Sequence, residues 1–329
     1  MRFSLKPLKP KKHRVNMVIK DHVIRFCYND QASLEDIQFV GEQMLPSGII
    51  KEGKVQDIFV LTSIIEELVE TYNWKRKKLY FCVPDSSVVI RPYKIPADLQ
   101  HDEVKGYLYM KLGEDLHLPF EDPVFDYHYL YQEEEHQHIL LFAYPEEQIR
   151  TYESIFQEAK LKPQAADLSS LSLFRLYQYF EQVQEDEHLL SIQWNVDGCV
   201  VTVFHDERPV FIQHMKTPLD ASLFKSNEEA FTAVEWHGEQ QDIDAYIHDQ
   251  VQEIERIMNF YRFSVTKGKA GITKVLLSGD FPQMDMIRQQ CEERFSVPVE
   301  HLNISDIYTK EGVEIPDLLA ETAGLSLKE

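Results

Sequence analysis

"HLLSIQWNVDGCVVTVFHDERPVFIQHM", residues 188–215, predicts three antiparallel strands joined by two tight turns. Apolar and β-branched residues, which favour strands, fill positions 189–194, 199–204 and 210–212. Asn195-Val196-Asp197-Gly198 and Asp206-Glu207-Arg208-Pro209 separate these runs, and their residue types favour turns because of their backbone geometry. The stretch therefore predicts a β-meander in the second half of the chain.

The composition indicates a globular protein with a sizeable core. The chain has 329 residues, of which 43% are apolar and 12% aromatic, and this length allows two lobes or two domains. Charged residues make up 27% and there are only 12 glycines, so the composition excludes a disordered or low-complexity chain. The formal net charge of −21 argues against nucleic-acid binding, which needs clustered Lys and Arg.

The charge is unevenly distributed. Six cations precede residue 15 and leave −27 on the remainder of the chain: Arg2, Lys6, Lys9, Lys11, Lys12 and Arg14. Residues 1–14 are therefore expected to form a basic flexible arm on an acidic body. Two interpretations stay open, namely contact with an anionic membrane surface and a solvated, frayed terminus.

The four cysteines, Cys27, Cys82, Cys199 and Cys291, are widely spaced, and none forms a CxxC motif. We expect reduced, buried thiols in a cytosolic protein. No apolar stretch approaches the ~20 residues that span a bilayer. Charged residues interrupt the segment after the basic arm, so a signal peptide is not expected.

The first half predicts an α/β unit followed by a small module. A hairpin is expected over 15–19 and 23–28, and a helix after Asp57. Two strands joined by a Pro-Asp-Ser-Ser turn are expected within 78–96. The module has a helix over 102–116, strands over 124–131 and 138–145, and a helix over 146–161. The helix after Asp57 has its apolar stripe at Phe59, Ile64, Ile65, Leu68 and Val69.

The second half repeats the plan of the first. A helix over 165–183 precedes the meander, and a long helix follows with a buried stripe at Ile247, Val251, Ile254, Met258 and Tyr261. A strand over 272–280, a helix over 282–297, an edge strand over 298–302 and a closing helix over 316–327 complete the chain. We therefore expect a duplicated α/β architecture with two lobes facing a cleft. The expected division is 15–92 for the first-lobe core, 93–163 for an inserted αββα subdomain, and 164–329 for the second lobe.

These features resemble the PilM family, actin-like components of type IV pilus assembly that are related to FtsA. The most specific likeness lies in "YKIPADLQHDEVKGYLYMKLGEDLHLPFEDPVFDYHYL", 93–130, and in "FAYPEEQIRTYESIFQEAKLKPQAADL", 142–168. "VLLSGD" at 275–280 and "FSVPVEHLN" at 295–303 resemble the family's "VLLSGG" and "LGVPVxxxNP". The resemblance implies the two-lobed actin-like ATPase (ribonuclease H-like) fold, with the insertion in the first lobe.

The nucleotide motifs depart from the family pattern at all three phosphate loops. In the first loop, "GIDIGSSSIK", Val18 replaces the Asp and Lys20 the second Gly. In the second, "DIGxxxT", Gln193, Asn195 and Cys199 replace the Asp, the Gly and the hydroxyl residue. In the third, "LSGG", Leu277-Ser278-Gly279-Asp280 ends in Asp.

These losses matter because carboxylates organise Mg²⁺ and glycines let the backbone approach phosphate. We therefore expect no cofactor and no ATP hydrolysis. Weak nucleotide binding stays open, because Lys20 and Arg25 could neutralise phosphate without metal. An active ATPase of the same fold, with ATP and Mg²⁺ as its ligands, is the alternative function.

Other constellations predict no catalysis and no metal. His136 and His138 could form a metal pair, but an acidic solvated turn explains them as well. No nucleophile or zinc motif occurs. Phe125, Tyr127, Tyr129 and Tyr131 alternate along one strand and are expected to share a face. Phe125 and Tyr127 fit the core of the module, and the remaining aromatic surface fits protein recognition.

The resemblance implies a cytoplasmic scaffold that binds the N-terminal cytoplasmic peptide of a PilN-like bitopic membrane protein and is recruited by it to the membrane. Other pilus inner-membrane components and self-association are further possibilities. An FtsA-like filament protein is a second alternative, which predicts a basic amphipathic C-terminal helix, whereas the sequence ends in "AGLSLKE". The expected peptide groove lies where the first lobe meets the module, and its candidate residues are Arg91, Tyr93, Ile95, Lys105, Tyr109, Leu112, Pro119 and Phe120. Tyr109 is either a binding anchor or a shield of the module.

Overall fold

Two five-stranded sheets of the same topology form the body of the protein. The computed structural model describes residues 13–180, 183–184, 186–225 and 234–329. The first sheet has the order β3-β2-β1-β6-β10, and the second has the order β13-β12-β11-β16-β17. In each sheet three antiparallel strands come first, and two parallel strands follow on the other side. This repeated order confirms the duplicated two-lobed architecture.

The strands of the first sheet are β1 (Arg14–Ile19), β2 (Val23–Asn29), β3 (Ile37–Met44), β6 (Lys78–Cys82) and β10 (Lys162–Asp167). Those of the second are β11 (Leu189–Asn195), β12 (Gly198–His205), β13 (Arg208–Lys216), β16 (Lys274–Gly279) and β17 (Val299–His301). The predicted meander is confirmed as β11, β12 and β13. The sequence analysis missed β3 and β10.

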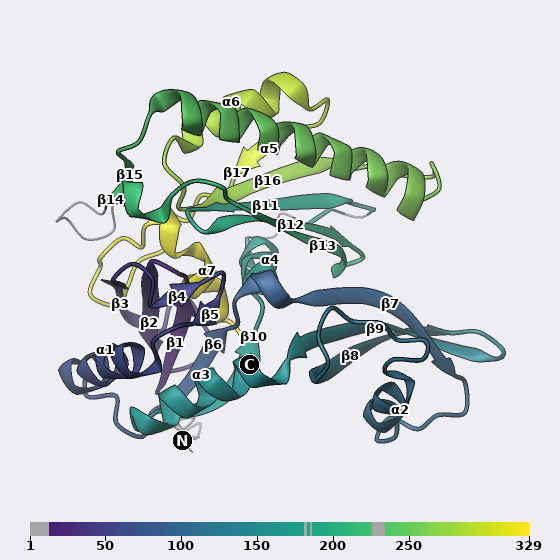
Figure 1. Cartoon of the computed structure of the whole chain (residues 1–329), viewed down its shortest axis with the longest axis horizontal. Coiled ribbons are helices and arrows are strands. Elements are labelled where there is room, and N and C mark those ends of the chain that lie inside the picture. The colour runs from purple at the N-terminus through teal and green to yellow at the C-terminus, as the bar shows by residue number, and fades with distance from the viewer. Residues whose placement is uncertain (1–12, 181–182, 185, 226–233) are drawn as a thin grey trace, which may run out of the picture.

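Helices cover the two sheets and fill the space between them (Figure 1). α1 (Ile58–Thr71) and α3 (Glu146–Glu158) pack on the first sheet, and α5 (Gln240–Phe260) and α6 (Met284–Arg294) pack on the second. α4 (Ser169–Tyr179) and α7 (Ala320–Leu325) lie between the sheets, where their buried side chains join residues of β2, β11 and β16 in a third core.

The close contact of α4 with α7 depends on a glycine. A Cβ on Gly324 would lie 2.0 Å from the carbonyl oxygen of Ser172, so no larger residue fits there. The hydroxyl of Ser172 donates to the carbonyl of Glu321 at 2.9 Å. α7 also lies against β1, β2 and β6 of the first sheet. The closing helix therefore ties the two lobes together, and assigning it to the second lobe alone was wrong.

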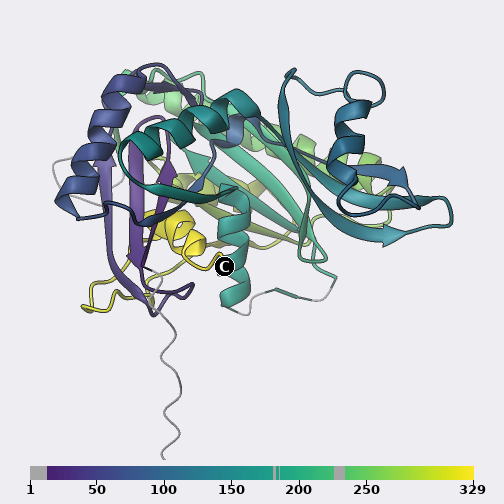
Figure 2. The same cartoon turned by 90° about the horizontal axis from the view of Figure 1, so that it is seen from below.

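A separate small module projects from the first lobe (Figures 1 and 2). It consists of β7 (Val89–Pro96), α2 (Val104–Lys111), β8 (Pro123–Gln132) and β9 (His136–Pro145), and its sheet has the order β7-β9-β8. Its own core includes Ile95, Leu108, Phe125, Ile139 and Leu141, which lie between the sheet and α2.

The module spans residues 89–145 in the structure, whereas the sequence predicted 93–163. All of β7 pairs with β9, so the module begins before residue 93. α3 buries Tyr152, Ile155 and Phe156 in the core of the first lobe, and β10 pairs with β6 of the first sheet. The predicted αββα unit was therefore wrong at its second helix, because α3 is amphipathic but its partner is the main sheet.

Three local predictions also need correction. α2 ends at Lys111 rather than at residue 116, and Leu112 already has extended backbone. Phe59 is exposed, because the buried face of α1 runs through Leu61, Ile65 and Leu68. Phe125 and Tyr127 do line the module core, as expected.

A β-bulge between Tyr129 and Tyr131 changes which face the last aromatic residue occupies. Tyr129 is opposite Ile139, on the core face, but Tyr131 is opposite His138, on the other face. The four aromatic side chains of β8 therefore do not share one face. His138 stacks on Tyr131 and pairs with Glu133 at 3.0 Å.

Smaller elements complete the fold: β4 (Ile50–Lys51), β5 (Lys54–Val55), β14 (Phe224–Lys225), β15 (Glu235–Trp236) and several short turns of helix. All four cysteines are buried and free, as expected. Among the described residues, no helix has the length and apolar character that a membrane span requires. Most of the expected basic arm, residues 1–12, lies outside the described residues.

Candidate functional site

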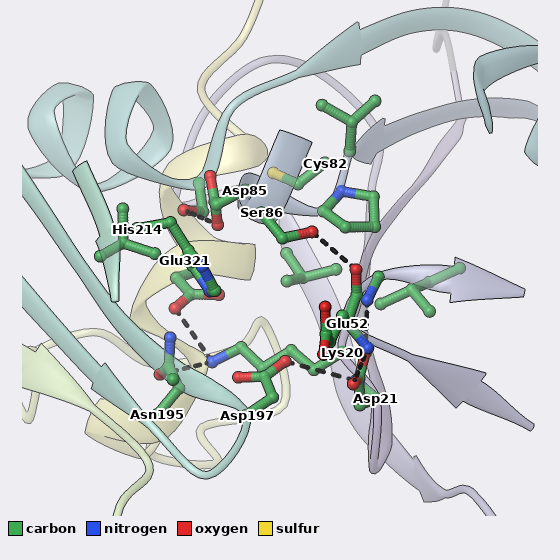
Figure 3. Close-up of a pocket in the computed structure, with 18 residues that line it drawn as sticks. Lys20, Asp21, Glu52, Cys82, Asp85, Ser86, Asn195, Asp197, His214 and Glu321 are labelled. Carbon is green, nitrogen blue, oxygen red and sulfur yellow. Dashed lines mark hydrogen bonds and ion pairs between the residues drawn. The ribbon is translucent and has the colours of Figure 1, made fainter. Parts of the chain in front are cut away.

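The turns of two equivalent hairpins meet between the lobes. The β1–β2 turn carries Lys20, Asp21 and His22, and the β11–β12 turn carries Val196 and Asp197. The backbone N–H of Asp21 donates to the Asp197 carboxylate at 3.4 Å. The topology thus brings together the loops that correspond to the family's first two phosphate loops, and Asp280 joins them from the end of β16 (Figure 3 shows the first two).

Lys20 crosses from the first lobe to the second and is 8% exposed. Its Nζ donates to Asn195 Oδ1 at 2.8 Å, to Glu321 Oε1 at 3.0 Å and to Asp280 Oδ2 at 3.3 Å. All three protons of the ammonium group therefore have a partner. The three residues that sequence analysis placed in three separate degenerate loops, Lys20, Asn195 and Asp280, are thus in direct contact.

Asp280 also contacts two further basic side chains besides Lys20. Arg25 Nη1 lies 2.5 Å from Asp280 Oδ2, and His22 Nε2 lies 3.3 Å from the same oxygen. The other oxygen, Oδ1, accepts the backbone N–H of Val196 at 3.1 Å. We call Lys20, Arg25 and Asp280 the inter-lobe clamp, because its cations come from the β1–β2 turn and from β2 of the first lobe, and its anion directly follows β16 of the second.

The environment keeps the clamp charged. Burial alone would lower the pKa of Lys20 and of Arg25, but Asp280 raises both values above their ordinary range. Burial alone would likewise raise the pKa of Asp280, but Lys20 and Arg25 hold it well below its usual range. At neutral pH the clamp is therefore a fully ionised, buried cluster.

The other positions of the three degenerate loops are occupied by residues that pack or form hydrogen bonds within the protein. Val18 packs against Cys82 and Leu325 as a small apolar cluster where the family carries its Asp. Gln193 is fully buried, and its Oε1 accepts the hydroxyl of Ser169 at 2.7 Å. Cys199 belongs to the core of the second lobe. Ser278 donates to the carbonyl of Ile192 at 3.5 Å. At Gly279, where φ is +130°, a Cβ would lie 2.0 Å from the carbonyl oxygen of Trp194.

A small acidic cavity remains beside the clamp (Figure 3). Its volume is about 40 Å³, and Asp21, Asp85 and Asp197 are among its lining residues. Typical ligand pockets are roughly 300–1,000 Å³ in volume. Burial raises the pKa of Asp85 to about 7, and burial with the nearby Asp197 raises the pKa of Asp21 to about 6. The Ser169 hydroxyl that lies 2.7 Å from Gln193 Oε1 also lies 2.6 Å from Asp85 Oδ2, so its single proton is shared between the two acceptors.

Metal ligands are not assembled in this cleft. Across the ranges that the structure describes, no group of three or more His, Cys, Asp or Glu side chains is arranged to hold a metal ion. The ammonium group of Lys20 lies among the acidic residues of the cavity (Figure 3).

The eight residues predicted for partner binding do not form one surface. Ile95 is fully buried in the module core, so it cannot contact a partner, and Leu112 packs partly buried against the same core. Arg91 and Tyr93 are half-buried on β7. Tyr109 is exposed, donates its hydroxyl to the carbonyl of Pro123 at 3.0 Å and packs on Phe125, which suits the shielding role.

Two grooves flank the module. Of the three remaining predicted residues, Lys105 lines the larger groove, and Pro119 and Phe120 line the smaller one. The larger groove is about 900 Å³ and is lined by Lys105, by residues of β8 and β9, by 166–168 and Leu171, and by residues 206–209 at the β12–β13 turn and the start of β13. The smaller is about 460 Å³ and is lined by Pro119 and Phe120 with residues of β5 and α3. Sequence analysis missed the β12–β13 turn as a groove wall, because its proximity comes only from the packing of the lobes.

The sequence analysis also missed Glu321, which completes the shell of Lys20 from α7. No motif marked it, since it lies in the closing helix, whose residues are all buried, and only the packing of that helix against the first sheet brings it to the cleft.

The fold and the filled cleft define a two-lobed protein of the actin-like class. A solved "PilM-PilN type IV pilus biogenesis complex" is similar with a TM-score of 0.76 and 15% identity, over 97% of this chain and 100% of that one. EutJ from Carboxydothermus hydrogenoformans has a TM-score of 0.54 at 10% identity, over 98% and 91%. ADP-bound MreB5 of Spiroplasma citri has a TM-score of 0.50 at 7% identity, over 95% and 94%. No curated protein matches the sequence significantly.

Residues 23–217, more than half of the chain, match the family described as "Type IV pilus assembly protein PilM". The chain belongs to this family.

The first prediction concerns the clamp. Asp280→Asn removes the anion that two buried cations share, and we expect it to lower the free energy of unfolding by about 3–5 kcal/mol in denaturant titrations. Lys75→Gln is the matched control, because Lys75 and Glu70 form an ion pair of the same 3.3 Å length as Lys20 and Asp280 but fully at the surface. It should have no measurable effect. Similar losses in both variants would contradict the clamp.

The second prediction concerns Asp85. Its pKa is raised from 3.8 to about 7 in the folded state, so the folded protein holds a proton that the unfolded chain has lost between these pH values. Wild-type stability should therefore fall as pH rises through this window. Asp85→Asn, which can still accept from Ser169, should exceed the wild type by about 1–3 kcal/mol above pH 7 and by less near pH 4. The exposed Asp98→Asn should show no such pH-dependent difference.

Proposed function

We propose that this protein is a non-catalytic scaffold of a type IV pilus or related pilus or competence assembly machine. Its partner is the short N-terminal cytoplasmic peptide of a PilN-like membrane protein, which recruits it to the inner face of the cytoplasmic membrane. The family assignment supports the pilus role. The similarity to a chain of a PilM-PilN complex supports the choice of partner.

The inter-lobe clamp is the observation that carries the non-catalytic part of the proposal. A bound phosphate in such a cleft would be held by loop N–H groups and by cations from both lobes. Asp280 already receives this set, because its carboxylate accepts the N–H of Val196 and pairs with Arg25 and Lys20. The protein thus supplies its own anion where a phosphate would otherwise bind.

The metal half of a nucleotide site is also lacking. Mg²⁺ is bound through carboxylates that hold its waters. At the two positions where the family has Asp, this chain has Val18, in an apolar cluster, and Gln193, whose Oε1 is engaged by Ser169. The residues present do not fit Mg-ATP, and we assign no reaction to the cleft.

The larger groove is the proposed docking site for the peptide. It has an apolar wall from Leu130, Leu140 and Phe142 and a second apolar wall from Leu168 and Leu171. At about 900 Å³ it is large enough for several side chains of an extended or helical peptide. Lys105 lies at its margin, so one residue of the predicted set belongs to it.

The third prediction tests nucleotide binding. Titration calorimetry of the intact chain with ATP and Mg²⁺ should show an affinity weaker than about 1 mM, and no phosphate release should be detected. The physical reason is that a phosphate group would have to displace Asp280 from Lys20 and Arg25. Micromolar binding, or a crystal structure with nucleotide ordered between the lobes, would overturn the scaffold proposal.

The fourth prediction tests the groove. Leu130 is half-buried on its wall, and Leu130→Glu should weaken the binding of the PilN-like N-terminal peptide at least tenfold, because it places a charge in an apolar groove. The measurement is fluorescence anisotropy with labelled peptide, and the melting temperature serves as the folding check.

Two companion variants distinguish the surfaces around the module. Phe120→Ala alters the smaller groove, and Tyr109→Ala alters the surface over α2, so both should leave peptide affinity within about twofold. Loss of affinity in Tyr109→Ala alone would instead place the peptide on α2. Loss in Phe120→Ala alone would place it in the smaller groove.

A further inference from the structure

The C-terminal end of α5 is an exposed apolar tip. After Phe260 the helix continues as a single π-helical turn, Tyr261–Val265. Phe260, Phe263 and Val265 are 50%, 63% and 42% exposed. We call residues 260–269 the α5 tip.

The α5 tip has a buried anchor residue and defined hydrogen bonds, unlike a frayed helix end. Tyr261 is buried, and its hydroxyl lies 2.8 Å from His188 Nδ1. The wider turn is closed by the N–H of Thr266, which donates to the carbonyl of Tyr261 at 3.0 Å. The N–H of Gly268 then donates to the carbonyl of Arg262 at 2.7 Å. These bonds fix one aromatic ring inside while its neighbours point outward.

The α5 tip is also the centre of a basic segment in a very acidic chain. Residues 256–279 contain five Lys or Arg and no Asp or Glu, although the chain has 55 acidic residues. Arg262, Lys267 and Lys269 are exposed, and among the described residues none of the three forms an ion pair. Arg262 lies over the ring of Phe263 at 5.3 Å. Cations that the protein itself leaves unneutralised are available to an external anion.

We propose that the α5 tip docks on an anionic lipid surface. Exposed aromatic side chains beside unpaired Lys and Arg are the combination that binds the headgroup region of such membranes. The tip protrudes at the end of a helix and lines neither of the two grooves, so its shape suits a broad surface rather than an inserted peptide (Figure 1).

Charge arithmetic favours a membrane over a nucleic acid. An extended polyanion would have to run from the tip along the rest of a chain whose overall net charge is −21, whereas a lipid surface can be touched at the tip alone. At physiological ionic strength the Debye length is about 8 Å, so charges farther from the membrane are largely screened. The local cations therefore decide the interaction at close contact.

The α5 tip and the module lie toward the same end of the molecule (Figure 1). A contact of the tip with lipid goes beyond the proposed partner peptide, because it needs no second protein. It would add a second, independent attachment to the membrane.

The experiment is co-sedimentation of the full chain with phosphatidylcholine vesicles that contain or lack phosphatidylglycerol, at about 0.15 M salt. The wild type should bind only the anionic vesicles. The triple variant Arg262→Gln, Lys267→Gln and Lys269→Gln should lose binding by on the order of a hundredfold, at about fivefold for each cation. Phe263→Ser should also weaken binding, with the melting temperature unchanged because this ring is mostly exposed.

Matched controls carry the same changes elsewhere. The triple variant Lys75→Gln, Lys78→Gln and Lys162→Gln alters three exposed first-lobe cations, and Phe59→Ser alters a ring that is 81% exposed on α1. Both should bind like the wild type. Absence of wild-type binding, equal binding to neutral vesicles, or equal loss in the controls would overturn the proposal. Peptide affinity should be unchanged in the tip variants, so a failure here leaves the scaffold proposal to its own test.

Discussion

The carboxylate of Asp280 holds the two lobes at one angle to each other. It stands at the end of β16 in the second sheet, but its charge is matched by Arg25 and Lys20 from the first. Such a buried cluster is weak evidence for added stability, since desolvating the ions costs about as much as their attraction returns. Its effect is on specificity, because any arrangement that separates the lobes removes Asp280 from both of its cations, Lys20 and Arg25. The inter-lobe angle is therefore set by the chain itself.

The sequence was sufficient to predict the parts of the fold that depend on local patterning. The two hairpins, the meander and the long amphipathic helix α5 all have strong strand or helix periodicity, and the structure confirms them. The assignment of elements to layers was less predictable. α3 has the same amphipathic pattern whether it covers the module or the main sheet, and only the long-range pairing of β10 with β6 decides between them.

The candidate site, like the fold, was predictable from local sequence patterns but not in its long-range contacts. Lys20, Asn195 and Asp280 were identified because each departs from a known loop pattern, but the sequence could not show that these departures compensate one another in space. No sequence pattern identified Glu321 or the β12–β13 turn as part of a site, since their roles depend on where α7 and β13 pack. The partner residues were least predictable, because Ile95 faces the core of the module and α2 ends before Leu112.

The clamp and the larger groove are connected by geometry. One side of the groove belongs to the module and the first lobe, and the opposite side is the β12–β13 turn of the second lobe. The width of the groove therefore depends on the angle between the lobes. In proteins that close around a ligand, that angle changes when the ligand leaves. Here the anion is part of the chain and cannot dissociate, so we expect the groove to keep one shape. A fixed groove lowers the cost of ordering the protein when a peptide binds, which suits a scaffold better than a nucleotide-driven switch.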